Sequence, residues 1–208
     1  MDLDTWYSII DDNIEPIKKF FDSHYSGDGV ILDIGGNLGA FTDYALSKYP
    51  NTEIHIFEPA SKFKNYLDNK YKNTSVVFVP FGLSDKNYTT HLKCDNDNLG
   101  YNYIVEDSSC ETISLITLDN YIFNHIKNKI SFIKIDTELF EPFVLNGMKN
   151  YITNTANINL PIIIIEHNYV HSPYKIEQQQ VFDWLFKYYR GFDYQAYDKT
   201  TDIVLIPL

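Results

Sequence analysis

The chain has 208 residues, of which 44% are hydrophobic and 22% charged, and its formal net charge is -11. This length and composition fit one folded domain with its own hydrophobic core, and they exclude a disordered or fibrous chain. The negative charge disfavours a nucleic-acid partner, because phosphate contacts from basic side chains dominate that kind of affinity.

The cysteines and the apolar runs indicate the compartment. Cys94 and Cys110 do not form a C-x-x-C pair and are expected to be free thiols. The longest apolar run, around 160–165, has the length of a strand and not of a membrane span. The first residues are acidic and lack the apolar core of a secretion signal. We therefore expect a cytoplasmic protein without a membrane span.

Short apolar runs alternate with amphipathic patterns along the chain, which predicts a parallel β-sheet with helices on both faces. An N-terminal helical region, residues 1–29, comes first, with a helix over 12–24. The strands predicted after it cover 30–32, 54–57, 76–79, 130–135 and 161–165. The predicted helices cover 38–49, a segment around 63–71, 141–151 and 175–190.

Two further segments complete the predicted fold. Residues 85–128 are polar and turn-rich, and we expect an inserted, partly β excursion over the active edge of the sheet, with a helix over 119–127 capped by Asp119. Residues 192–197 and 202–207 predict a closing antiparallel hairpin. The expected fold is a single Rossmann-like α/β domain over 1–208, with a seven-stranded, mostly parallel sheet.

A glycine-rich turn follows the first predicted strand, with the sequence Asp33-Ile34-Gly35-Gly36-Asn37-Leu38-Gly39. Glycines let the backbone turn sharply, so that amides at the start of the next helix face a ligand. The turn lacks the G-x-G-x-x-G spacing of pyrophosphate-binding loops. Glu58 ends the next strand, 25 residues after Asp33, where a carboxylate can accept both hydroxyls of a ribose. The alternative is a structural turn with a surface glutamate.

These motifs resemble those of the FkbM-type methyltransferases, a branch of the Rossmann-like S-adenosylmethionine enzymes. The resemblance covers about residues 30–167 in collinear order. Its blocks are 30–39 (similar to D-x-G-A-N-x-G), 57–59 (F-E-P), 82–85 (A-L-S-D), 117–119 (T-L-D) and 134–141 (K-I-D-x-E-G-x-E).

Two positions depart from the family pattern. Gly36 replaces the usual alanine, and Leu139 replaces the glycine after the glutamate of the last block. If that glycine has a positive φ or clears space, Leu139 must bend the path of the chain or narrow the acceptor pocket.

The resemblance implies S-adenosylmethionine as the cofactor and gives each motif a role. The first block would hold the methionyl and ribose portions, Glu58 the ribose hydroxyls, and the turn after the third strand the adenine. The implied cofactor-binding residues are Asp33, Gly35, Gly36, Asn37, Gly39, Glu58, Gly82, Leu83 and Ser84.

The reacting centre is expected where the fourth and fifth strands end. Asp136, Glu138 and His167 are the candidate catalytic residues, because a carboxylate or an imidazole there could take the proton of a hydroxyl nucleophile. Asp136 could instead cap a helix or hold the cofactor, and His167 could be a hydrogen-bonded core residue. With Glu166 these side chains could gather Mg²⁺, but their spacing matches no dedicated metal motif and no metal site is predicted.

We expect an O-methyltransferase acting on a hydroxyl of a sugar, in a glycan or a glycosylated metabolite. Tyrosines mixed with Asn and Asp lie in the segments expected to flank the acceptor, and flat rings beside polar groups suit a sugar; they could also merely cover the sheet edge. These are Tyr88, Tyr101, Tyr103, Tyr169 and Tyr174. The alternatives are an RNA ribose 2'-O-methyltransferase, which the net charge disfavours, and a cofactor-binding protein that has lost turnover, which Leu139 admits.

Overall fold

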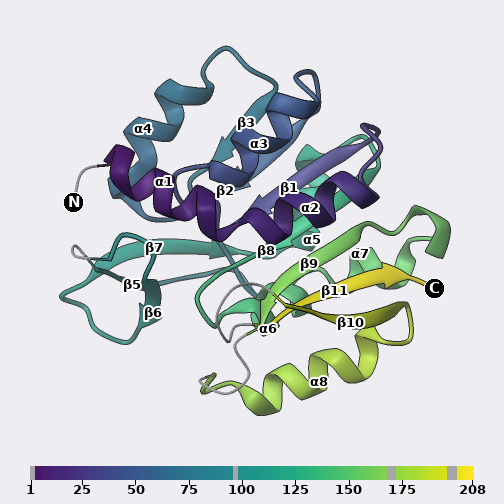
Figure 1. Cartoon of the computed structure of the whole chain (residues 1–208). Coiled ribbons are helices and arrows are strands. Elements are labelled where there is room, and N and C mark those ends of the chain that lie inside the picture. The colour runs from purple at the N-terminus through teal and green to yellow at the C-terminus, as the bar shows by residue number, and fades with distance from the viewer. Residues whose placement is uncertain (1–2, 96–97, 168–171, 196–200) are drawn as a thin grey trace.

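A computed structural model describes residues 3–95, 98–167, 172–195 and 201–208 of the chain, and within these ranges the side chains of 167, 192–195 and 201 are not described. In this part of the chain seven strands form a central sheet in the order β10-β11-β9-β8-β1-β2-β3 (Figure 1). They are β1 (Val30–Ile34), β2 (Ile54–Phe57), β3 (Val76–Val79), β8 (Ile130–Ile135), β9 (Ile162–His167), β10 (Tyr189–Gln195) and β11 (Thr201–Pro207).

The central sheet is mixed, which corrects the expectation of a mostly parallel sheet. The pairs β1–β2, β2–β3, β1–β8 and β8–β9 are parallel. The pairs β9–β11 and β10–β11 are antiparallel. For β10 and β11 the reason is their short connection, which cannot make the crossover that parallel neighbours need. The predicted closing hairpin is confirmed, and it places β11 directly against β9.

Helices cover both faces of the central sheet. The first group packs on one face: α1 (Leu3–Asn13), α2 (Glu15–His24), α3 (Ala40–Lys48) and α4 (Ser61–Tyr71). The second group packs on the other: α5 (Leu118–His125), α6 (Glu141–Asn146), α7 (Lys149–Asn154) and α8 (Lys175–Leu185), with the short 3-10 helix η1 (Asn157–Asn159) before β9. Successive residues of a strand face opposite sides, so in β1 Ile31 joins the first core while Leu32 joins the second.

A smaller sheet lies beside α1, where the partly β excursion is expected (Figure 1). Its order is β4-β7-β5-β6, with β4 (Gly82–Leu83), β5 (Tyr88–Cys94), β6 (Asn102–Val105) and β7 (Glu111–Ile116). The strands β5, β6 and β7 all lie within residues 85–128. No described helix is both long and apolar enough to span a membrane.

Several predicted helices have different bounds. The single helix over 12–24 is two, α1 and α2, with Pro16 in the first turn of α2, where its missing N–H costs no hydrogen bond. The single helix over 141–151 breaks at Gly147, which packs against the backbone of Ser84, and α8 ends at Leu185.

Asp119 does not cap the helix in which it lies, so that expectation is wrong. Thr117 is the N-cap of α5, and its hydroxyl accepts a hydrogen bond from the Asn120 amide at 3.2 Å. The Asp119 carboxylate instead accepts from the amides of Asn150 and Tyr151, at 3.1 and 2.7 Å. Asp119 therefore caps α7, a helix far along the chain that the fold brings next to α5.

Candidate functional site

A cavity of about 530 Å³ opens where the central sheet meets the smaller sheet. Its lining comes from the carboxyl ends of β1, β2, β8 and β9, from β4, β7 and β11, from the hairpin of β5 and β6, and from α1, α2 and α3. Ligand sites typically have volumes of about 300–1,000 Å³ and gather at such strand ends. The cavity therefore brings the predicted cofactor loop and the predicted reacting centre to one place.

Two glycines of the predicted loop let the chain pass very close to its neighbours. Gly35 has φ 74°, and a Cβ there would lie 1.7 Å from the backbone oxygen of Asp136. A Cβ on Gly36 would lie 2.2 Å from Cγ1 of Ile56, so an alanine could not fit without a shift. The departure at Gly36 thus has a local cause, and both glycines line the cavity with backbone.

A buried ion-pair network holds this loop from behind. Asp33 is fully buried, accepts a hydrogen bond from the Thr42 hydroxyl at 2.8 Å and lies 3.4 Å from Nζ of Lys134. Lys134 Nζ also lies 3.2 Å from Asp136 Oδ2 and donates to the Gly35 carbonyl. Burial alone lowers the pKa of Lys134, but Asp136 and Asp33 outweigh it and raise this pKa. Lys134 therefore stays charged and ties β1 to β8.

Glu58 lies at the end of β2 with its carboxyl at the cavity wall. It is only 6% exposed, and its two oxygens accept hydrogen bonds from the amides of Asn37, at 3.0 Å, and Ala60, at 2.9 Å. Burial raises the pKa of Glu58 to about 7, although these backbone hydrogen bonds oppose the shift. The side chain of Asn37 donates to the Leu99 carbonyl at 3.1 Å and so links the loop to the β5–β6 hairpin.

The other residues predicted to bind the cofactor divide into two groups. Gly82 and Leu83 line the cavity. Asp33, Gly39 and Ser84 lie outside its lining: Gly39 packs under Tyr71, whose hydroxyl donates to its carbonyl at 3.1 Å, and the Ser84 hydroxyl donates to Asp85 at 3.1 Å. These three residues support the wall from behind.

Acidic side chains gather at the end of the cavity that β8, β9 and β11 form. Asp136, Glu138, Glu166 and Asp202 all line it, and we call them the acidic end. Burial raises the pKa of Glu138 to about 8 and that of Asp202 to about 7, with Asp136 adding to both. The neighbouring Asp136, and then burial, raise the pKa of Glu166. At neutral pH these three carboxyls therefore hold protons for a substantial part of the time.

Two candidate residues fall partly or wholly outside the described part. The backbone of His167 ends β9, opposite Thr201, but its side chain is not described, so its catalytic role stays a prediction. Tyr169, a candidate for the acceptor site, lies outside the described residues. Among the residues that are described, no three metal-ligating side chains are arranged to hold a metal ion.

Leu139 adopts the left-handed conformation itself. Its φ is 75°, and the φ of Glu138 before it is 53°. The Glu141 carboxylate braces this turn by accepting from the amide and the hydroxyl of Thr137, at 2.8 and 3.0 Å. The Leu139 side chain is half-buried and lies outside the cavity lining, so it does not narrow the cavity. The backbone follows the bent path instead, at a cost in strain of about 1–2 kcal/mol.

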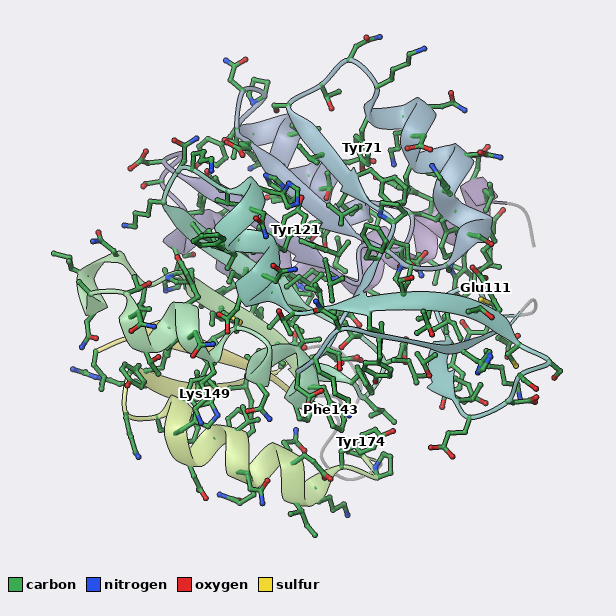
Figure 2. All side chains as sticks on the ribbon, turned by 180° about the vertical axis from the view of Figure 1, so that it is seen from behind. Tyr71, Glu111, Tyr121, Phe143, Lys149 and Tyr174 are labelled. Carbon is green, nitrogen blue, oxygen red and sulfur yellow. The ribbon has the colours of Figure 1, made fainter. Side chains whose placement is uncertain are left out.

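The predicted tyrosines do not act as one group. Tyr101 lines the cavity, and its ring contacts that of Tyr103 with centroids 4.9 Å apart. Tyr88 lies outside the lining. Tyr174 packs edge-on against Phe143, with ring centroids 4.9 Å apart, and covers the outside of α6 (Figure 2).

The N-terminal helix supplies a wall that the sequence did not indicate. Trp6 and Ile10 of α1 line the cavity, and a Cβ on Gly100 would lie 3.1 Å from the Trp6 ring. The Tyr7 hydroxyl donates to Asp43 of α3 at 2.6 Å and anchors α1. The apolar spacing in α1 could have revealed a partly buried face, but not what that face covers.

Comparison with known proteins identifies the family. The family model for the methyltransferase FkbM domain matches residues 33–195, so this chain belongs to the FkbM methyltransferase family. No curated protein matches the chain.

Solved structures with similar folds include several methyltransferases. Methyltransferase FkbM from Methylobacillus flagellatus KT has a TM-score of 0.61 and 15% identity, covering 87% of this chain and 44% of that one. The chain thus spans less than half the length of that protein. An rRNA methylase from Streptococcus thermophilus has a TM-score of 0.53 and 11% identity, covering 94% of this chain and 96% of its own.

A proposed methyltransferase from Streptococcus mutans, solved in complex with SAH, has a TM-score of 0.54 and 10% identity, covering 94% of this chain and 98% of its own. At these identities the likenesses show the fold, which is the Rossmann-like methyltransferase fold.

Proposed function

We propose that the protein is an S-adenosylmethionine-dependent O-methyltransferase that acts on a hydroxyl of a sugar. The observation that carries this proposal is a single cavity lined at one end by Gly35, Gly36 and Glu58 and at the other by the acidic end. A methyl donor and an acceptor can share such a cavity, as an in-line transfer requires.

The residues at the first end fit the cofactor. Gly35 and Gly36 present bare backbone, and Glu58 offers a carboxyl suited to the hydroxyls of a ribose. Asn37 lines the same wall and has a buried Oδ1 without a hydrogen-bond partner among the described residues, so this end has unused capacity for a ligand. Gly82 and Leu83 would receive the adenine. When bound, S-adenosylmethionine supplies an electrophilic methyl group.

Asp136 is the residue we propose to remove the acceptor's proton. A hydroxyl is a weak nucleophile until a base takes its proton, and the base must lie within hydrogen-bond reach. Lys134, 3.2 Å away, keeps Asp136 oriented at the end of β8. Glu138 is less suited to this role, because its pKa of about 8 leaves it mostly protonated at neutral pH. His167 stays a second candidate base.

The lining of the cavity next to the acidic end supports a carbohydrate acceptor. The β5–β6 hairpin contributes the ring of Tyr101 and the amides of Asn98 and Asn102. A sugar has apolar faces and a rim of hydroxyls, so a flat ring beside amides and carboxyls matches both. The net charge of -11 weighs against RNA.

The proposal is tested in two steps. Calorimetry should first show that the protein binds S-adenosylmethionine and S-adenosylhomocysteine, and a preference for a nicotinamide dinucleotide would refute the cofactor. Mass spectrometry with deuterated-methyl cofactor should then show transfer to hexose or deoxyhexose hydroxyls, free or in short oligosaccharides. Methylation of RNA or a protein side chain without any carbohydrate product would refute the acceptor, and cofactor binding without any transfer would indicate a protein that has lost turnover.

A further inference from the structure

The acidic end holds more carboxyl groups than the cations of the described lining can neutralise. It holds four carboxyl groups, those of Asp136, Glu138, Glu166 and Asp202. Lys134 is the one cation among the described residues that line the cavity, and it is already engaged by Asp33, Asp136 and the Gly35 carbonyl. A buried carboxylate without a partner is costly, so such a group must either keep a proton or meet a cation.

Asp202 is the clearest case. It is 3% exposed, it lines the cavity, and its Oδ2 is buried without a hydrogen-bond partner in the described part of the chain. Its neighbour across the strands is Glu166, since β11 pairs with β9 in the register that sets these two residues opposite each other. Two carboxyls on adjacent strands thus line the same side of the cavity.

The position of this pair separates it from the cofactor end. The sheet order places β11 beyond β9 and β8, whereas the glycine loop leaves β1 and Glu58 ends β2. Neighbouring strands lie about 4.8 Å apart, so β11 is about 14 Å from β1. A ligand that occupies the β1 and β2 ends leaves the Glu166–Asp202 side for the second substrate.

We propose that the acceptor is an amino sugar whose protonated amine binds between Glu166 and Asp202 while its hydroxyl reaches Asp136. This inference rests on the proposed function and specifies its substrate class. An ammonium group provides several N–H donors and a positive charge, so it satisfies the unpartnered oxygen of Asp202 and favours the ionised forms of the carboxyls beside it. An organic cation fits better than a metal ion, since the described carboxyls are not arranged around a common metal position.

The first experiment compares matched acceptors. Methyl glycosides of 2-amino and 4-amino hexoses are each paired with their N-acetylated forms, which keep the ring and lose the charge. Binding is measured by calorimetry with S-adenosylhomocysteine present, and transfer by mass spectrometry. The amino forms should bind and react at least about tenfold better, as for a hydrogen bond to a charged group. Equal or better use of the acetylated forms, or no binding of either, overturns the proposal.

The second experiment uses Asp202→Asn, which keeps the shape and removes the charge. The variant should lose about tenfold or more in affinity for the amino glycoside, and its affinities for both cofactor forms should stay unchanged. Asp183→Asn, the same change on the exposed surface of α8, is the matched control and should bind like the original protein. Glu166→Gln is the second variant if Asp202→Asn does not fold.

A comparison of the two cofactor forms shows whether the Glu166–Asp202 pair binds the amine of the acceptor or the sulfonium of the cofactor. S-adenosylmethionine carries a sulfonium and S-adenosylhomocysteine does not. If Asp202→Asn weakens only the former, the pair neutralises the sulfonium and the amine proposal is wrong. If the unchanged protein binds neither form, the proposed function itself fails, and that outcome is distinct from failure of the amine site alone.

Discussion

At Glu58, burial and hydrogen bonding shift the pKa of the carboxyl in opposite directions. Burial raises its pKa to about 7, and the amides of Ala60 and Asn37 stabilise the charged form. The group is therefore close to half ionised at neutral pH. Hydroxyl groups of a ribose donate to the ionised form, so binding of the cofactor and ionisation of Glu58 should favour each other.

We expect Glu58→Gln to weaken the affinity for both S-adenosylmethionine and S-adenosylhomocysteine by about tenfold or more at pH 8, because hydrogen bonds to a charged group contribute about 1.5–3 kcal/mol. Affinity of the original protein should rise as the pH passes upward through 7, and that of the variant should not. Calorimetry measures both. Glu53→Gln, at the other end of β2, is the control; equal affinities in all three proteins would remove Glu58 from the site.

Asp136 should matter for turnover and not for cofactor binding. We expect Asp136→Asn to lower kcat by about 10²–10⁴-fold, the usual effect of losing a general base, with cofactor affinity changed by less than about threefold. Glu138→Gln is the matched comparison and should lose much less, because Glu138 already holds its proton at neutral pH. Initial rates with an established acceptor measure these effects. An Asp136→Asn variant that keeps most of its activity would reassign Asp136 to a structural role.

At the scale of elements, the turn from β8 to α6 carries proposed catalytic carboxyls and also has a strained backbone. It carries Asp136 and Glu138 to the cavity and bends through two consecutive residues with positive φ, Glu138 and Leu139. The left-handed conformation disfavours a residue with a Cβ, and the hydrogen bonds from Thr137 to Glu141 hold the turn against that cost. The strain lies next to the proposed reacting centre.

Substitution at Leu139 should reveal this strain. Leu139→Gly and Leu139→Ala both remove the half-buried side chain, but only glycine adopts a φ of 75° without steric strain. The glycine variant should be the more stable by about 1 kcal/mol, which corresponds to about 2–4 °C in Tm for a chain of this size. Thermal unfolding at one pH compares the two. If the alanine variant melts at the same temperature or higher, the turn is not strained.

At the scale of the molecule, the buried acids make stability depend on pH. The unfolded chain releases the protons of glutamate near pH 4.5, whereas Glu58, Glu141 and Glu138 in the folded protein have pKa values of about 7, 7 and 8. Asp202 behaves likewise, with a pKa of about 7 against 3.8. Between these limits the folded state binds more protons than the unfolded state, so the free energy of unfolding falls as pH rises.

We expect Tm without ligand to fall by about 5 °C or more between pH 5.5 and pH 8, since one pKa unit corresponds to about 1.4 kcal/mol and each kcal/mol to about 2–4 °C. His55 opposes this trend below pH 6.5, because burial lowers its pKa, but it is one group against several. Calorimetric scans across the range measure the slope, and Asp202→Asn should reduce it. A flat or rising Tm would show that these carboxyls are not buried as described.

Local sequence patterns determined most strands and the glycine-rich turn. The strands at 54–57 and 76–79 have the predicted bounds, because a short apolar run bounded by polar residues is a local signal for a strand. The glycine turn and the carboxylate at Glu58 are also visible locally, since a close backbone approach selects glycine and a polar residue marks the end of an apolar strand.

The tertiary structure alone decided which residues far apart in the chain meet. Asp202 reaches the cavity only because β11 inserts between β9 and β10, and its strand pattern does not specify that neighbour. Trp6 becomes a wall of the cavity only because α1 packs beside the smaller sheet, and Asp119 caps α7 for the same kind of reason. The spacing of apolar residues along a helix or strand specifies which of its faces is buried. The partner that covers this face depends on long-range packing, which no local pattern encodes.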